Sequence, residues 1–104
     1  MPKYYFAVAS QKFFLEEEPI EEVLREKTYY YSTIQKPIDF WLVLNPKFLD
    51  KPEISKLKDK IKQPAAAIIS TNPTFINWIK LRIGYVLTGQ VEETDLKNLL
   101  AEAA

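Results

Sequence analysis

The side chains that could do chemistry in this chain are carboxylates, cations and aromatic rings, because it contains neither His nor Cys. Trp78, Arg82 and Tyr85 form the most informative group. If a helix begins near Pro73, a rotation of about 100° per residue brings the three to neighbouring positions. A guanidinium between an indole and a phenol can stack on either ring and still donate to a carboxylate. Trp, Tyr and Arg are also the types enriched where protein interfaces bind most strongly.

The alternative for this group is structural. Trp78 and Tyr85 could complete the core while Arg82 reaches out to solvent or to an acidic side chain. The pattern alone leaves both interpretations open.

Asp39 and Phe40 pose a similar question at the start of an expected strand. Strand alternation places Phe40 on one face and Asp39 with Trp41 on the other. A carboxylate beside bulky aromatics needs either a position at the rim or a cation, and Arg82 is a candidate for that cation. From the residue types alone, this pairing is a hypothesis.

Most catalytic chemistry is disfavoured by what the chain lacks. Without His there is no Ser-His-Asp arrangement, no usual proton shuttle and almost no route to a zinc or di-iron site. Gly84 and Gly89 are the only glycines, so no glycine-rich phosphate loop can form. A pair of carboxylates is available in principle, but no spacing singles one out. We expect no enzyme activity, no metal and no cofactor, and therefore a binding protein.

The length and net charge of the chain limit the number of domains and the classes of partner that we expect. A chain of 104 residues with 47% hydrophobic content predicts one domain. Its formal net charge of zero disfavours nucleic acid. No apolar run approaches the roughly 18 residues that span a bilayer, so we expect no direct membrane insertion. The first residues lack the pattern of a signal peptide, so we expect the protein to stay in the compartment where it is made.

The expected elements describe an α+β fold, a single compact domain with a mostly antiparallel sheet of three or four strands packed with helices. Strands are predicted near residues 3 to 9, 38 to 44 and 65 to 70, with a further short strand at residues 13 to 15. Helices are predicted from about 16 to 34, within 52 to 63, and from Pro73 with an apolar stripe that runs to Leu87. Asn72 and Pro73 are typical of an N-cap and a first helical position. Residues 1 to 90 form the domain and 91 to 104 a helical or frayed tail.

Lysines at every second position from 56 to 62 raise the question of an anionic ligand. Asp59 lies among them and no aromatic residue is interleaved, so a solvated helix face is the better interpretation.

Four segments closely resemble a small protein family of cyanobacteria and plastids, the auxiliary subunit of the aerobic magnesium-protoporphyrin IX monomethyl ester oxidative cyclase. They are residues 4–13 (YYFAVASQKF), 15–19 (LEEEP), 39–43 (DFWLV) and 64–76 (PAAAIISTNPTFI), and the similarity extends over about residues 3 to 88.

The resemblance implies a non-catalytic assembly factor for chlorophyll biosynthesis. In that family a separate di-iron subunit forms the isocyclic ring, and the small protein binds and stabilises it. Family positions implicated in this docking correspond to Asp39, Phe40 and Arg82. The resemblance therefore implies a partner-binding surface that includes these three residues, with Trp78 and Tyr85 as supports. The implied location is the cyanobacterial cytoplasm or the plastid stroma, with any thylakoid association made through the partner, and other chlorophyll-biosynthesis enzymes are further candidate partners. The alternative function is a carrier that delivers the porphyrin ester to the cyclase.

Overall fold

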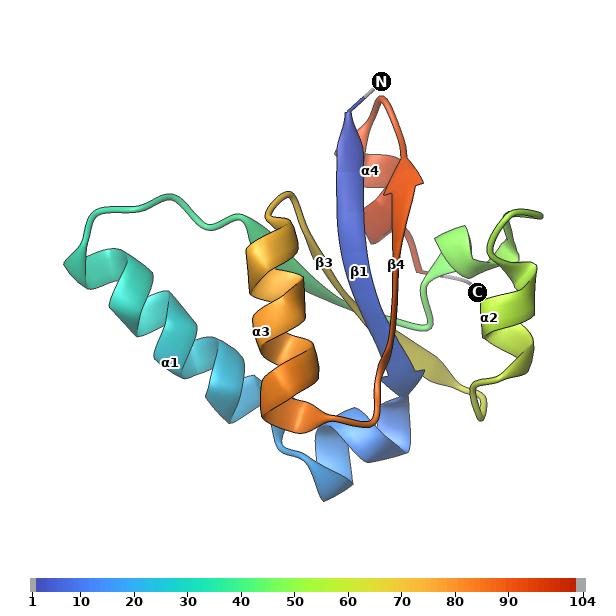
Figure 1. The fold of residues 1–104 in the computed structure, drawn as a ribbon, viewed down its shortest axis with the longest axis horizontal. Helices are drawn as coiled ribbons and strands as arrows, with labels where there is room; N and C mark the ends of the chain where they lie inside the picture. The colour runs from blue at the N-terminus through green and yellow to red at the C-terminus, as the bar shows by residue number, and fades with distance from the viewer. Residues whose placement is uncertain (1, 103–104) are drawn as a thin grey trace.

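The computed structural model describes residues 2–102, whose centre is one four-stranded antiparallel sheet. Its order is β2-β3-β1-β4, and every neighbouring pair is antiparallel (Figure 1). The strands are β1 (Lys3–Ser10), β2 (Phe40–Leu44), β3 (Ala65–Ser70) and β4 (Leu87–Glu92). The predicted α+β class and its three expected strands are confirmed, and β4 is a strand that the sequence analysis did not predict.

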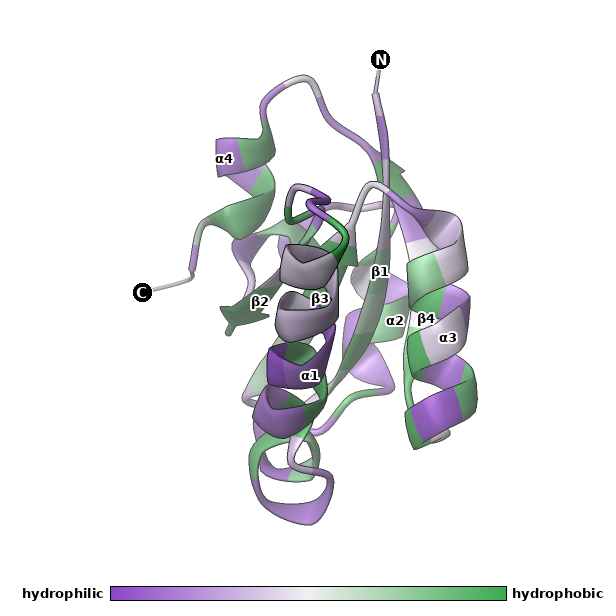
Figure 2. Cartoon of the chain, turned by 90° about the vertical axis from the view of Figure 1, so that its left-hand side faces the viewer, coloured by the Kyte–Doolittle hydropathy of each residue, from purple (hydrophilic) through white to green (hydrophobic). Residues whose placement is uncertain are grey.

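Helices cover both faces of this sheet. On one face lie α1 (Ile20–Thr33) and α3 (Pro73–Ile83). On the other lie the 3-10 helix η2 (Lys47–Asp50), α2 (Ser55–Asp59) and α4 (Leu96–Leu100). Figure 2 shows α3 and α4 on opposite sides of the strands. No helix among residues 2–102 is long and apolar enough to cross a bilayer.

The strands alternate between two separate cores. Ala7 and Ala66 face α3 and pack with Ile76 and Ile79. Phe6 and its neighbours of the same parity face the opposite core. Small side chains on the first face let α3 lie close to the sheet, and all six residues of β3 are buried because both faces are covered.

Local interactions explain where α3 begins and where it ends. The side chain of Asn72 accepts a hydrogen bond from the Thr74 N–H at 2.9 Å, and Pro73 takes the first helical turn, as predicted. The helix ends at Ile83 because Gly84 adopts a φ of +94°, which favours glycine. The expected helical stripe is therefore too long: Val86 and Leu87 follow a sharp turn and lead into β4.

The expected short strand at residues 13 to 15 is wrong. Phe13–Glu17 forms a π-helical turn, η1, in which Ser10 Oγ accepts from the Phe13 N–H at 3.1 Å. This hydrogen bond turns the chain as soon as β1 ends, and it buries Phe14.

The C-terminal segment packs on the sheet through two elements. The boundary expected between residues 90 and 91 falls inside β4, which pairs with β1 over its whole length. The helix expected in the tail is α4, whose Leu99 is fully buried beside η2. Residues 103 and 104 of the expected tail lie outside the described residues.

Candidate functional site

Asp39 lies where the loop after α1 enters β2, and two side chains engage its carboxylate. The Tyr31 hydroxyl donates to Oδ1 at 3.0 Å, and Lys36 Nζ lies 3.5 Å from Oδ2. Burial, followed by the hydrogen bond to Asp39, raises the pKa of Tyr31 above its ordinary value, so the phenol remains a donor. The cation beside Asp39 is therefore Lys36, and the expected pairing of Asp39 with Arg82 is wrong.

The backbone of Asp39 also fixes the start of α3. Its carbonyl accepts from Ser70 Oγ at 2.8 Å and from the Thr71 N–H at 3.2 Å. These contacts join the entry of β2 to the junction between β3 and α3.

Phe40 belongs to the core beneath this junction. Its side chain is 5% exposed. Its ring stacks on Phe75 with centroids 4.7 Å apart and meets Tyr31 edge-on at 5.4 Å. Phe40 therefore supports the surface from below, because so little of its ring reaches solvent.

Trp78 is half-buried, and its ring contacts a cation from a different helix. Its ring lies 5.9 Å from that of Phe75, and Lys27 Nζ lies 4.1 Å from the Trp78 ring centroid. The sequence predicted that Arg82 could stack on this indole, but the structure places Lys27 there. This cation–π contact links α1 to α3.

Arg82 lies in the last turn of α3, among side chains that point into solvent. Leu81 is 86% exposed and Tyr85 is 87% exposed. The ion pairs of the described residues join Lys36 to Asp39, Lys51 to Glu93 and Lys58 to Asp50, so the Arg82 guanidinium is in none of them.

Tyr85 is not on the helix, because it follows Gly84. Its ring meets Phe13 of η1 edge-on at 6.4 Å. We call Leu81, Arg82 and Tyr85 the α3 end surface.

The five predicted site residues thus fall into two groups. Asp39, Phe40 and Trp78 lie around the beginning and middle of α3, whereas Arg82 and Tyr85 lie at its end. Arg82 is nine residues beyond Pro73, which corresponds to about 14 Å along the helix axis. Leu81 was missed, although an apolar residue on the side of α3 opposite Ile79 and Ile83 could have been found from the helical spacing.

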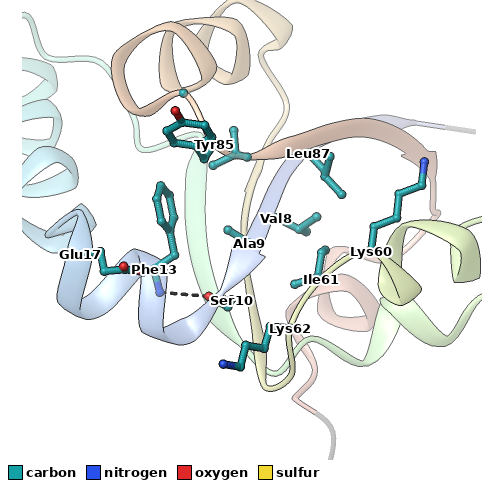
Figure 3. Close-up of a pocket in the computed structure, with 12 residues that line it drawn as sticks. Val8, Ala9, Ser10, Phe13, Glu17, Lys60, Ile61, Lys62, Tyr85 and Leu87 are labelled. Carbon is teal, nitrogen blue, oxygen red and sulfur yellow. Dashed lines mark hydrogen bonds between the residues drawn. The ribbon is translucent and has the colours of Figure 1, made fainter.

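A groove of about 530 Å³ lies next to the α3 end surface, at the end of β1 (Figure 3). Val8 and Ile61 lie between its two sides. Phe13 and Tyr85 are on one side, and Lys60 is on the other. Among residues 2–102, no group of three or more acidic side chains is placed to hold a metal ion.

Comparison with known proteins places the chain in a family. A family model described as Ycf54 protein matches residues 2–93. The chain belongs to the Ycf54 family. This membership is consistent with the resemblance to auxiliary cyclase subunits found in the sequence.

Ycf54 relatives occur in cyanobacteria and in plants. A Ycf54-like protein of Synechocystis is 54% identical over 92 residues, covering 88% of this chain and 69% of the relative. The chloroplastic protein YCF54 of Arabidopsis thaliana is 44% identical over 100 residues, covering 95% of this chain and 46% of the relative. The crystal structure of the Ycf54 protein from Thermosynechococcus elongatus is similar with a TM-score of 0.90, at 52% identity, over 98% of this chain and 95% of that one. The sources of these relatives fit a cyanobacterial or chloroplast protein, and their names state no catalytic activity.

Proposed function

We propose that this protein is a non-catalytic auxiliary factor that binds and stabilises the di-iron catalytic subunit of the magnesium-protoporphyrin IX monomethyl ester oxidative cyclase. It would act in the cyanobacterial cytoplasm or plastid stroma, in formation of the isocyclic ring of chlorophyll. Membership of the Ycf54 family supports the proposal through the resemblance described above. The observation that carries it is the α3 end surface, where Arg82, which is in none of the ion pairs of the described residues, is close in the chain to two strongly exposed side chains, Leu81 and Tyr85.

This surface has the energetic character of a binding site. Leu81 and Tyr85 remain almost fully in water in the isolated chain. Burying such side chains contributes roughly 1.5–3 kcal/mol each. The planar Arg82 guanidinium can donate two parallel hydrogen bonds to a single carboxylate of the partner. A partner that covers the three residues together gains both apolar burial and a charge-assisted contact.

The α3 end surface is carried by a helix that is held firmly in the core, which reduces the conformational entropy lost on binding. The Asn72 cap fixes the start of α3, and Ile79 and Ile83 anchor its inner face in the core. Lys80 Nζ donates to the Val86 carbonyl at 3.1 Å and holds the turn that carries Tyr85. Asp39, Phe40 and Trp78 would then contribute by holding α1 and α3 in place.

The test is the affinity of purified Arg82→Ala for the purified catalytic subunit, together with the level of that subunit in cells that carry the variant. We expect binding at least about tenfold weaker, because the lost contact is worth roughly 1.5–3 kcal/mol. The thermal midpoint should stay unchanged, since Arg82 takes part in none of the ion pairs among residues 2–102. Arg25→Ala is the matched control because Arg25 is an exposed arginine of α1. Equal affinities for the unaltered protein and Arg82→Ala would refute the assignment of Arg82.

The alternative carrier function has one observation in its favour, the groove beside Tyr85. Its volume of about 530 Å³ is in the range of small-molecule sites. A titration with the magnesium porphyrin ester, followed by visible absorbance, distinguishes the two functions. Tight stoichiometric binding supports the carrier, and an unchanged spectrum supports the auxiliary factor.

A further inference from the structure

The groove at the end of β1 has charges of opposite sign on its two sides. Lys60 and Lys62 line it from the segment that follows α2, and Glu17 lines it from η1 (Figure 3). Ile61 is buried between the two lysines, so the segment is anchored in the core while both of its lysines are exposed. The side chains of Lys60 and Lys62 leave the two sides of Ile61 in different directions, so each presents its ammonium group at a separate point on the border of the groove (Figure 3).

These two lysines differ from their neighbour Lys58. The Lys58 ammonium is paired with Asp50, whereas Lys60 and Lys62 take part in none of the ion pairs formed within residues 2–102. Their charges are therefore available to an acidic group from outside the chain.

The opposite wall is aromatic and held in place. Phe13 and Tyr85 meet edge-on there, and Tyr85 is largely exposed. The Gln11 N–H donates to the Pro64 carbonyl at 2.8 Å, which joins η1 to the segment that carries the lysines. This hydrogen bond ties the segment that carries the lysines to the end of β1, next to Phe13.

We infer that the groove binds an acidic and apolar polypeptide segment of the catalytic subunit, so this inference rests on the proposed function. An aliphatic or aromatic side chain of that segment lies on Val8 and Ile61 against Tyr85, and a neighbouring Asp or Glu pairs with Lys60 or Lys62. The groove borders the α3 end surface through Tyr85, so one partner can cover both. Electrostatic complementarity sets the orientation of the segment.

The charge pattern favours a polypeptide over a tetrapyrrole. The magnesium porphyrin ester could pair its carboxylate with a lysine, but it carries no N–H donor for the exposed Glu17 carboxylate on the other side of the groove. A polypeptide can place an acidic residue at the lysines and a basic or amide residue at Glu17.

The test compares the affinity of the purified catalytic subunit for the unaltered protein, Lys60→Glu/Lys62→Glu and the control Lys56→Glu/Lys97→Glu. The control has the same change in net charge at exposed lysines outside the groove. We expect the groove variant to bind about tenfold more weakly, since each exposed pair contributes modestly and reversal replaces attraction with repulsion. The difference should shrink at high salt because the contacts are exposed.

A second measurement identifies the occupant. A photoreactive phenylalanine analogue in place of Tyr85 should cross-link to a peptide of the catalytic subunit in which Asp or Glu lies beside apolar residues. If the reversed pair perturbs folding in a circular-dichroism melt, Lys60→Gln/Lys62→Gln serves instead, with Lys56→Gln/Lys97→Gln as control.

Four results would overturn the inference. Equal losses in the groove and control variants would mean that only net charge matters. No loss in either, with the unaltered protein still binding, would refute the groove alone and leave the proposed function standing. No binding by the unaltered protein would refute both. A porphyrin absorbance shift that the reversed pair abolishes would assign the groove to a tetrapyrrole.

Discussion

Replacing Phe40 by Ala separates a contact with a partner from support of the fold. The Phe40 ring is 5% exposed, stacks on Phe75 at 4.7 Å and meets Tyr31 edge-on at 5.4 Å. These contacts join β2, α3 and α1. Truncation leaves a cavity beneath the start of α3, so we expect any loss of complex in this variant to follow from a weakened fold.

The expected loss of stability in Phe40→Ala follows from the burial of the Phe40 side chain. A fully buried Phe replaced by Ala costs about 3–5 kcal/mol of the free energy of unfolding. A domain of this size has only about 5–15 kcal/mol in total. A change of 1 kcal/mol lowers the melting temperature of such a domain by about 4–8 °C, so Phe40→Ala should melt more than about 12 °C lower. Phe40→Leu keeps part of the buried volume but loses the ring contacts with Phe75 and Tyr31, so it should cost about 1–3 kcal/mol, less than Phe40→Ala.

The assay pairs circular-dichroism melts with binding to the catalytic subunit at a temperature where every variant is folded. Under those conditions Phe40→Leu should bind like the unaltered protein, whereas Arg82→Ala should bind weakly without any change in melting temperature. The reasoning fails if Phe40→Ala keeps its melting temperature within about 2 °C and still loses the partner. That result would mean that the ring itself contacts the partner.

Three further predictions concern the stability of the fold. Gly89→Ala places a Cβ 2.6 Å from the Phe6 ring, so its free energy of unfolding in urea should fall by about 1–3 kcal/mol, and an unchanged value would show that the ring can move aside. Asn72→Ala removes the cap of α3 and should cost about 1 kcal/mol in the same assay, while Asn72→Asp should restore most of it; equal losses in both would contradict a capping role. The pKa of Glu93 is lowered from 4.5 to about 2 by hydrogen bonds from Asn98 and Lys51, so its stabilisation is complete above pH 4.5 and is lost as the pH falls toward 2. Glu93→Gln should flatten this dependence in urea melts between pH 6 and pH 3, and parallel profiles would refute the assignment.

The sequence predicted the elements whose signals are local. The strands near residues 3, 40 and 65 are rich in aromatic, branched or small apolar residues, and Asn72 with Pro73 marks the start of α3. β4 was missed because Val86 and Leu87 continue the helical spacing of Ile79 and Ile83. Only Gly84 contradicts that spacing, and its φ of +94° could not be foreseen from one residue type.

The candidate site was harder to predict because its residues meet through the tertiary fold. The types of Asp39 and Arg82 suggested an ion pair, but Asp39 lies at the start of α3 and Arg82 at its end. The cation on Trp78 comes from Lys27 of α1, and the spacing within α3 contains no information about that helix. The groove brings together segments around residues 8, 13, 60 and 85, which only the paired sheet places side by side.

We propose different physical roles for the two groups of residues, which are separated along α3. Asp39 binds the Tyr31 hydroxyl through its carboxylate and the β3–α3 junction through its carbonyl, so it holds α1 and α3 together. Arg82 stabilises nothing through an ion pair within the described chain and stands beside exposed Leu81 and Tyr85. Arg82 lies about 14 Å along the helix axis from the start of α3, and the Asp39 carboxylate is already bound by Tyr31 and Lys36, which leaves it fewer acceptor positions for a partner. We therefore favour direct contact with a partner at Arg82, with Asp39 fixing the helix that carries it. We therefore predict that substitution of Arg82 weakens the complex by removing a contact, whereas substitution of Asp39 weakens it by displacing the helix.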